Sequence, residues 1–179
     1  MRVLNIHQRE LAASPAQVGE LIDSLAGPRD SLWPRHSWPR MQFDRPLAEG
    51  AVGGHGPIRY FVEQYVPGTS IRFRFTGPRG FDGYHGFDCQ PTSRRTVVLK
   101  HTLQMTAHGP AIVTWPLLYR PLHDALIEDS LATAQAALGL EPDVRPWSTW
   151  VRLLRWALTG RGARPQTIVS PQVPRGVSP

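Results

Sequence analysis

The order of sequence patterns between Arg45 and Gly139 constrains the fold most. Segments of alternating apolar and polar residues, separated by glycine- and proline-containing turns, are followed by one long helical pattern, GPAIVTWPLLYRPLHDALIEDSLATAQAALG. A period of two predicts strands with one buried face, and a spacing of three and four predicts a helix. The chain is therefore expected to be α+β, with a curved antiparallel sheet wrapped around a long C-terminal helix. Such a sheet encloses space, which favours ligand binding.

The composition limits the classes of protein that fit. A length of 179 residues is usual for one domain. Cys89 is the single cysteine, so the chain has neither an internal disulfide nor a cysteine pair for zinc, which indicates a reducing, cytoplasmic compartment. The start, MRVLNIHQRE, lacks the apolar stretch of a signal peptide. No run reaches the ~18 apolar residues of a membrane span.

The positive charge is unevenly placed along the chain. The net charge is +6, and residues 140–179 contribute six arginines against Glu141 and Asp143. A nucleic-acid-binding domain is expected to carry a basic stripe on its folded body. Because the excess lies in the tail, we expect no nucleic-acid partner.

The N-terminal region predicts a strand followed by two short helices. Residues 3–13 form the strand, and Ser14 with Gln17 makes a capping box for a helix over residues 14–25. The next segment, DSLWPRHSWPR, contains prolines that limit it to a loop or a second, broken helix. Its tryptophans could anchor it to the core or form a lid. GAVGGHG lacks the lysine of a phosphate loop and predicts a hairpin turn instead.

A tight turn at Pro67-Gly68 predicts the register of the hairpin around it. A two-residue connection places Glu63 opposite Arg72, an opposite-charge pair that suits the outer, convex face. The other face then points inward, and its members are Ile58, Tyr60, Val62, Gln64, Ile71, Phe73 and Phe75.

The next two strands, residues 81–89 and 97–105, also have one apolar face each. Matching these faces pairs Phe87 with Leu99 and His85 with His101, because a one-residue slip would turn the apolar side chains to water. This register predicts a polar row inside the sheet that contains Gln64, His85 and His101. Two histidines without an evident third ligand do not make a metal site, so no metal and no other cofactor is expected.

The long helix is expected to be irregular in its first half. Pro116 and Pro121 each remove one backbone hydrogen bond, and a cavity could open beside them. His123 shares the helical phase of Ile127 and could face that cavity. No catalytic residue is evident, and the expected ligand-binding residues are Tyr60, Val62, Gln64, Phe73, His85, Phe87, His101, Leu103, Trp115 and His123.

Residues 1–139 resemble the START-like or SRPBCC superfamily, the polyketide cyclase and lipid transport group. The blocks GGHGPIRYFVEQYVPG, IRFRF and WPLLYRPLHDALIED are similar to uncharacterised actinobacterial members. The resemblance implies a helix-grip fold. It also implies a function among lipid or hormone binding, aromatase or cyclase chemistry and membrane association. It supplies no family-wide catalytic residues.

The tail lies outside the resemblance. Residues 140–160 predict an amphipathic helical extension, and residues 161–179 predict a disordered tail. On a helical wheel Arg152 and Arg155 oppose an apolar face, whose members include Trp147, Trp150, Leu154 and Leu158. This face could dock on the protein body, on a membrane surface or on a protein partner.

Three functions follow from these patterns. The first is non-catalytic binding of a small hydrophobic ligand, lipid or polyketide-like, in an internal cavity. The second is an aromatase or cyclase acting on such a molecule, with His85, His101 or Tyr60 as general acid or base. The third is a membrane-associated adaptor that acts through the C-terminal helix.

Overall fold

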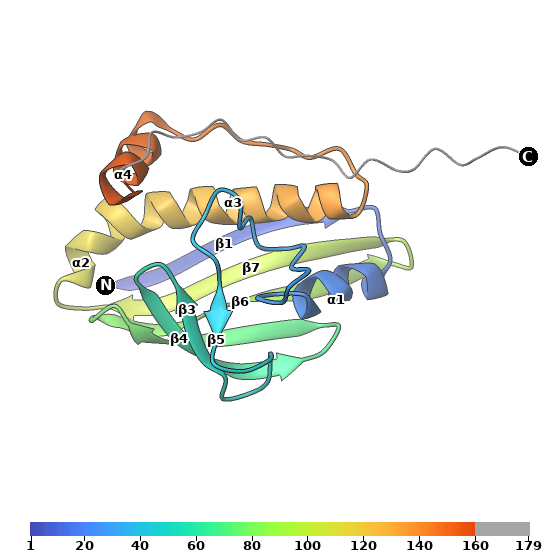
Figure 1. Cartoon of the computed structure of the whole chain (residues 1–179), viewed down its shortest axis with the longest axis horizontal. Helices are drawn as coiled ribbons and strands as arrows, with labels where there is room; N and C mark the ends of the chain where they lie inside the picture. The colour runs from blue at the N-terminus through green and yellow to red at the C-terminus, as the bar shows by residue number, and fades with distance from the viewer. Residues whose placement is uncertain (160–179) are drawn as a thin grey trace, which may run out of the picture.

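The computed structural model describes residues 1–159 and shows a seven-stranded antiparallel sheet gripping a long helix (Figure 1). The strand order is β1-β7-β6-β5-β4-β3-β2. The strands are β1 (Arg2–Leu11), β2 (Gln42–Phe43), β3 (Val52–His55), β4 (Ile58–Val66), β5 (Ser70–Gly77), β6 (Phe81–Ser93) and β7 (Thr96–Ala107). The helices are α1 (Pro15–Asp23), α2 (Ala111–Thr114), the π-helical turn η1 (Trp115–Tyr119), α3 (Arg120–Ala137) and α4 (Thr149–Thr159). The predicted α+β helix-grip arrangement is confirmed.

One short helix, not two, lies near the N-terminus. The predicted capping box is present, since Ser14 and Gln17 each satisfy the other's backbone N–H. The second predicted helix is absent, and residues 24–41 form turns and bends instead. Trp33 donates its indole N–H to the carbonyl of Pro39, and Trp38 donates to Asp129 on α3. Both tryptophans are buried, so they anchor the segment to the core.

The β4–β5 hairpin contains a bulge that the sequence did not reveal. Val62 lies opposite Phe73 as predicted, but an irregularity between Val62 and Gln64 leaves Glu63 without a partner residue on β5. The predicted Glu63–Arg72 pair is therefore wrong, and Glu63 instead makes an ion pair with Arg74 at 2.7 Å. The extra residue also turns Gln64 from the concave face to the convex face, and its side chain is exposed there.

The β6–β7 hairpin is shifted by two residues from the predicted register. His85 lies opposite Leu103, and Phe87 lies opposite His101, because both strands extend to a tight turn at residues 94–95. A shift of two residues keeps every side chain on its predicted face. His85 and His101 therefore both point inward and are buried, as expected. They are diagonal neighbours, with His85 Nδ1 3.4 Å from His101 Nε2.

The long helical segment is irregular at its prolines, as predicted. Between α2 and α3 the backbone forms the π-helical turn η1, with Pro116 inside it and Pro121 just beyond. Pro121 cannot donate to the carbonyl of Leu117, four residues earlier. That carbonyl instead accepts a hydrogen bond of 2.8 Å from the indole N–H of Trp150 on α4. The proline break thus creates an attachment point for the C-terminal helix.

Helix α4 packs against α3 (Figure 1), and its Arg155 contacts Trp38 in the segment 24–41. Val151 is buried, and the Arg155 guanidinium lies 4.2 Å from the ring centre of Trp38 and 4.4 Å from that of Trp147. Arg155 was expected on the outer side. It faces inward because two electron-rich rings and a backbone carbonyl accept its charge. Residues 161–179, expected to be disordered, lie outside the described part of the chain.

The interior consists of two apolar clusters. The large core joins α1, the segment 24–41, the C-terminal half of α3 and the strands beside them. The small core lies at the other end of the sheet, next to α2 and η1, and its buried members are Phe75, Phe81, Leu103, Met105, Ala107, Ala111 and Trp115. No helix within residues 1–159 is long and apolar enough to cross a membrane.

Candidate ligand-binding cavity

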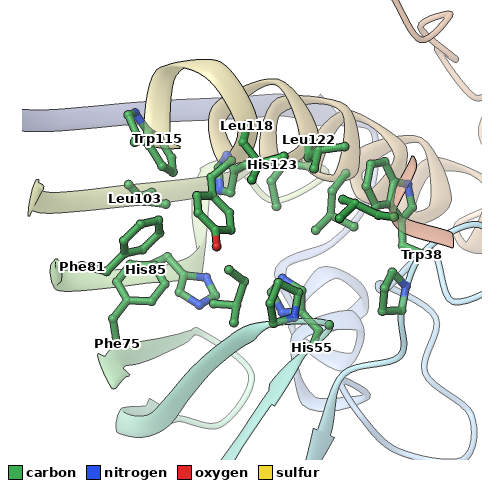
Figure 2. A pocket seen from close by; sticks show the side chains of 18 of the residues that line it. Trp38, His55, Phe75, Phe81, His85, Leu103, Trp115, Leu118, Leu122 and His123 are labelled. Atoms are coloured by element: carbon green, nitrogen blue, oxygen red, sulfur yellow. The ribbon is translucent and has the colours of Figure 1, made fainter. Parts of the chain in front are cut away.

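A cavity of about 410 Å³ lies between the sheet and the long helix, where the large core meets the small core. Helical side chains cover it from one side and strand side chains from the other (Figure 2). The helical wall comes from η1 and α3, and the strand wall comes from β5, β6, β7 and residues 55–58, which connect β3 to β4. The segment 33–39 and α4 complete the lining. Nearly all of these groups are apolar or aromatic, so the cavity suits a hydrophobic molecule.

The π-helical turn contributes directly to the wall. Trp115, Leu118 and Tyr119 of η1 all line the cavity. Phe81 packs edge-to-face against both Trp115 and Tyr119, with ring centres 5.9 and 5.1 Å apart. The irregular backbone at the prolines therefore shapes the end of the cavity that the small core closes.

Four of the ten predicted ligand-binding residues line the cavity, namely His85, Leu103, Trp115 and His123. Five others point inward but lie in the packed interior, outside the cavity lining: Tyr60, Val62, Phe73, Phe87 and His101. All five except His101 belong to the large core, where the ring of Phe43 packs against Tyr60 and Phe73, with ring centres 5.8 and 5.7 Å away. Gln64 lies on the convex face because of the bulge at Glu63.

Sequence reasoning missed several wall residues. Trp33 and Trp38 line the cavity from the anchored segment, and Arg155 and Leu158 line it from α4. His55 also lines it, at the end of the glycine-rich strand β3. The repeated Trp-Pro-Arg motif was a usable signal for the tryptophans. The glycines around His55 removed the apolar alternation that would have marked its face.

Three imidazoles, those of His55, His85 and His123, are among the polar groups of the cavity wall. His55 Nδ1 and the Tyr60 hydroxyl share a hydrogen bond of 2.9 Å, and His85 shares one with His101. His85 Nε2 and both ring nitrogens of His123 are buried and have no hydrogen-bond partner among residues 1–159. An unpaired buried polar atom costs about 1–3 kcal/mol, so these atoms favour a ligand with a polar group.

Burial keeps these imidazoles neutral. It lowers the pKa of His55 to about 3, with His123 and Arg59 acting in the same direction. It lowers the pKa of His85 and of His101 well below the ordinary value. A neutral imidazole offers one donor and one acceptor. Arg155 contributes the one permanently charged group among the described residues of the lining.

No known family model matches the chain, and no curated protein sequence matches it. Solved structures do match. A protein from Thermobifida fusca shares 14% identity at a TM-score of 0.57, over 79% of this chain and 99% of its own. Norcoclaurine synthase from Thalictrum flavum, bound to a transition-state analogue, shares 15% identity at a TM-score of 0.58, over 78% and 96%.

A second structure of that synthase, with dopamine and hydroxybenzaldehyde, gives a TM-score of 0.57 at 15% identity, over 78% of this chain and 88% of its own. At such identities the likeness defines the fold. The chain has the helix-grip fold of the Bet v1-like, START-like or SRPBCC proteins, as the sequence resemblance indicated.

Proposed function

We propose that this chain binds one small, mostly apolar molecule in the cavity and does not transform it. The observation that carries the proposal is an apolar cavity of about 410 Å³ with a few polar atoms on its wall. Small-molecule sites commonly span roughly 300–1,000 Å³ and combine apolar walls with a few fixed polar groups. The ligand class that fits is lipid or polyketide-like, an apolar or aromatic skeleton with one polar group.

The polar end of the ligand is expected to meet His85 and His123. Both line the cavity, and both have buried ring nitrogens without a hydrogen-bond partner among the described residues. Neutral imidazoles bind a hydroxyl or carbonyl without the desolvation cost of burying a charge. The aromatic side chains around them, Trp115 and Phe81, suit a flat or chain-like skeleton.

The same chemistry argues against catalysis. An efficient general acid or base has a pKa near the working pH, and burial moves the pKa of His85 far below it. No carboxylate or lysine is among the described residues that line the cavity. The aromatase or cyclase alternative needs His85, His101 or Tyr60 as the acid or base, and only His85 reaches the wall.

Native mass spectrometry of the purified full-length protein tests the proposal. We expect a co-purified apolar molecule whose mass is unchanged after incubation. A His85→Leu variant should lose affinity for ligands that carry a hydroxyl or carbonyl and keep affinity for the matching hydrocarbon. Conversion of the bound molecule, lost in His85→Gln with binding retained, would establish the enzyme instead.

A second candidate function, peripheral membrane contact, has its own observation. Large apolar side chains are exposed on α4 and on the neighbouring α2 and η1, and they are Ile112, Val113, Leu117, Trp150, Leu153, Trp156 and Leu158. Of the four contacts predicted from the sequence, Trp150 and Leu158 belong to this face, while Trp147 and Leu154 are partly buried. Exposed tryptophans and leucines beside Arg152 suit a bilayer interface, next to the cavity.

Co-sedimentation with anionic phospholipid vesicles tests this contact. Leu153→Glu places a charge on the exposed face of α4 and should reduce the sedimented fraction. Leu4→Glu changes another exposed leucine, on β1, and serves as the control. Equal sedimentation of the two variants and the wild type would exclude a role of α4 at membranes.

A further inference from the structure

Two histidines and an aspartate from distant parts of the sequence meet at the edge of the cavity. His7 comes from β1, and His123 and Asp124 come from α3. One ring nitrogen of each histidine and one Asp124 oxygen all lie within 4.8 Å of one another. Asp124 Oδ1 is 3.2 Å from His7 Nε2 and 3.6 Å from His123 Nδ1.

The two distances from Asp124 Oδ1 are close to the ligand spacing around a small metal ion. Zn²⁺ binds nitrogen and oxygen ligands at about 2.0–2.1 Å in a tetrahedron, which places neighbouring ligand atoms ~3.3 Å apart. The measured 3.2 and 3.6 Å distances bracket that value. Two imidazoles and one carboxylate are also a donor set that divalent transition metals favour.

Neighbouring side chains form hydrogen bonds with His7 and Asp124. Such bonds orient the ligands in known metal sites. Glu128 Oε1 lies 2.8 Å from His7 Nδ1 and can accept a hydrogen bond from its N–H. In that tautomer the lone pair of His7 Nε2 faces Asp124. Asn5 donates a hydrogen bond of 2.8 Å to Asp124 Oδ1. A carboxylate paired with the far nitrogen of a histidine ligand is the usual arrangement around bound zinc.

The charges around Glu128 and Asp124 differ, and this difference shows which of the two carboxylates is available to a cation. Glu128 is held by Arg9 at 2.7 Å and by Arg145 at 3.2 Å, so its charge is already balanced. Asp124 has one arginine nearby, the largely exposed Arg120 at 3.7 Å from its other oxygen. Asp124 is therefore the carboxylate that can neutralise part of the charge of a cation.

His123 supplies an independent reason for a ligand at this point. Both of its ring nitrogens are buried without a hydrogen-bond partner among residues 1–159, although His7 and His101 lie beside its ring. Within the described part of the chain, Nδ1 has only the distant Asp124 Oδ1 at 3.6 Å, and buried ring nitrogens without a hydrogen bond are unfavourable. A metal ion bound to Nδ1 would satisfy one of them.

We propose that His7 Nε2, His123 Nδ1 and Asp124 Oδ1 bind one divalent transition-metal ion of the Zn²⁺ type. Three protein ligands leave a fourth position for water or a ligand atom, as in zinc sites that bind small molecules. His123 also lines the cavity, so the site adjoins the space assigned to the apolar ligand. Metal binding itself does not depend on that ligand.

Titration of full-length, chelator-treated protein with Co²⁺ tests the proposal, because tetrahedral Co²⁺ has visible absorption bands that a random surface complex lacks. We expect one Co²⁺ per chain, displaced by Zn²⁺. Asp124→Asn should abolish the bands, and Glu128→Gln should weaken Co²⁺ binding by about 10–100-fold, as loss of an outer partner does. The double variant His36→Gln/His108→Gln removes two exposed histidines and should bind as the wild type does.

The fold of each variant is checked by circular dichroism and by the thermal midpoint without metal. Co²⁺ should raise that midpoint in the wild type and leave it unchanged in Asp124→Asn. If chelator-treated wild type shows no tetrahedral bands, or if folded Asp124→Asn binds equally well, the proposal is overturned. The cluster is then a protonated His7 between two carboxylates.

Discussion

The two apolar clusters of this molecule contain the same kinds of side chain but differ in how those side chains contact the cavity. In the large core, Phe73 touches the rings of Phe43, Tyr60 and His85, and the anchored segment 24–41 closes the space above. In the small core, Phe81 and Trp115 also make edge-to-face contacts, yet one side of each ring faces the cavity. The part of the large core around Phe73 lies outside the cavity lining, whereas most of the small core's aromatic rings form one end of the cavity wall.

Backbone chemistry explains the difference between the two clusters. The helix over the large core is regular and brings closely spaced small and branched residues down onto the sheet, among them Leu131 and Ala134. The helix beside the small core is interrupted at Pro116 and Pro121, and its backbone forms η1 there. A continuous helix packs tightly against a sheet, whereas a proline-interrupted one leaves room for a ligand.

Truncating one phenylalanine in each cluster should show the largest effect. Phe73→Ala removes a fully buried ring from the large core and should destabilise the fold by about 3–5 kcal/mol. Phe81→Ala should cost at least about 1 kcal/mol less, because its ring has fewer contacts to lose on the cavity side. Chemical denaturation measures both, and equal costs would show that the small core is as tightly packed as the large core.

Acid should lower the stability of the fold through His55, which lines the cavity beside the large-core residues Trp33 and Tyr60. Burial lowers the pKa of His55 to about 3 in the folded state, against an ordinary value of 6.5. Between these values the unfolded chain binds more protons, so the free energy of unfolding falls as the pH drops from about 6.5 toward 3. The slope from one such group is at most about 1.4 kcal/mol per pH unit.

Unfolding free energies of the wild type and of His55→Gln, measured from pH 7 to pH 4, test this dependence. The glutamine variant should lose stability less steeply over that range, because it lacks one titrating group. His85 and His101 titrate in the same direction and should keep some slope in both proteins. An identical slope would mean that His55 is not the group responsible.

The smallest effect concerns the attachment of α4 at the proline break. Trp150→Phe removes the hydrogen bond to the Leu117 carbonyl and should cost about 0.5–1.5 kcal/mol, at the lower end because Trp150 is half exposed. Hydrogen exchange across α4 should rise in this variant. Trp156→Phe, an exposed neighbour, is the control. Equal hydrogen-exchange rates across α4 in both variants would show that the hydrogen bond to the Leu117 carbonyl does not hold α4 in place.

The sequence predicted the faces of the strands better than their registers. Side-chain alternation is local, so Phe73, His85 and His101 were correctly placed inward. A bulge at Glu63 and a longer β6–β7 hairpin are small backbone changes without a strong residue signature. The bulge mattered more, because one extra residue moves Gln64 to the opposite face, whereas a shift of two residues moves no side chain across the sheet.

The candidate sites depended on contacts between distant segments. The prolines predicted where the helix loosens beside Trp115, and the strand alternation placed Leu103 on the inward face. Trp38 and Arg155 were not predicted to line the cavity, because their contact depends on the docking of α4. That docking joins residues more than a hundred positions apart in the sequence. Likewise, His7 and Asp124 meet only because β1 lies beneath α3, and no local pattern encodes that pairing.

Filling the cavity with a larger side chain tests most directly whether the cavity binds an apolar ligand. Leu122 is a half-buried wall residue of the cavity on α3 that also packs against the large core, and Leu122→Trp adds volume on the cavity wall. Binding of the fluorescent fatty acid cis-parinaric acid is titrated in the wild type, in Leu122→Trp and in Gln64→Ala, a control on the convex face. We expect binding in the wild type and in Gln64→Ala, and at least a tenfold loss in folded Leu122→Trp. Equal affinity in all three proteins, or no binding by the wild type, would contradict a ligand-binding cavity.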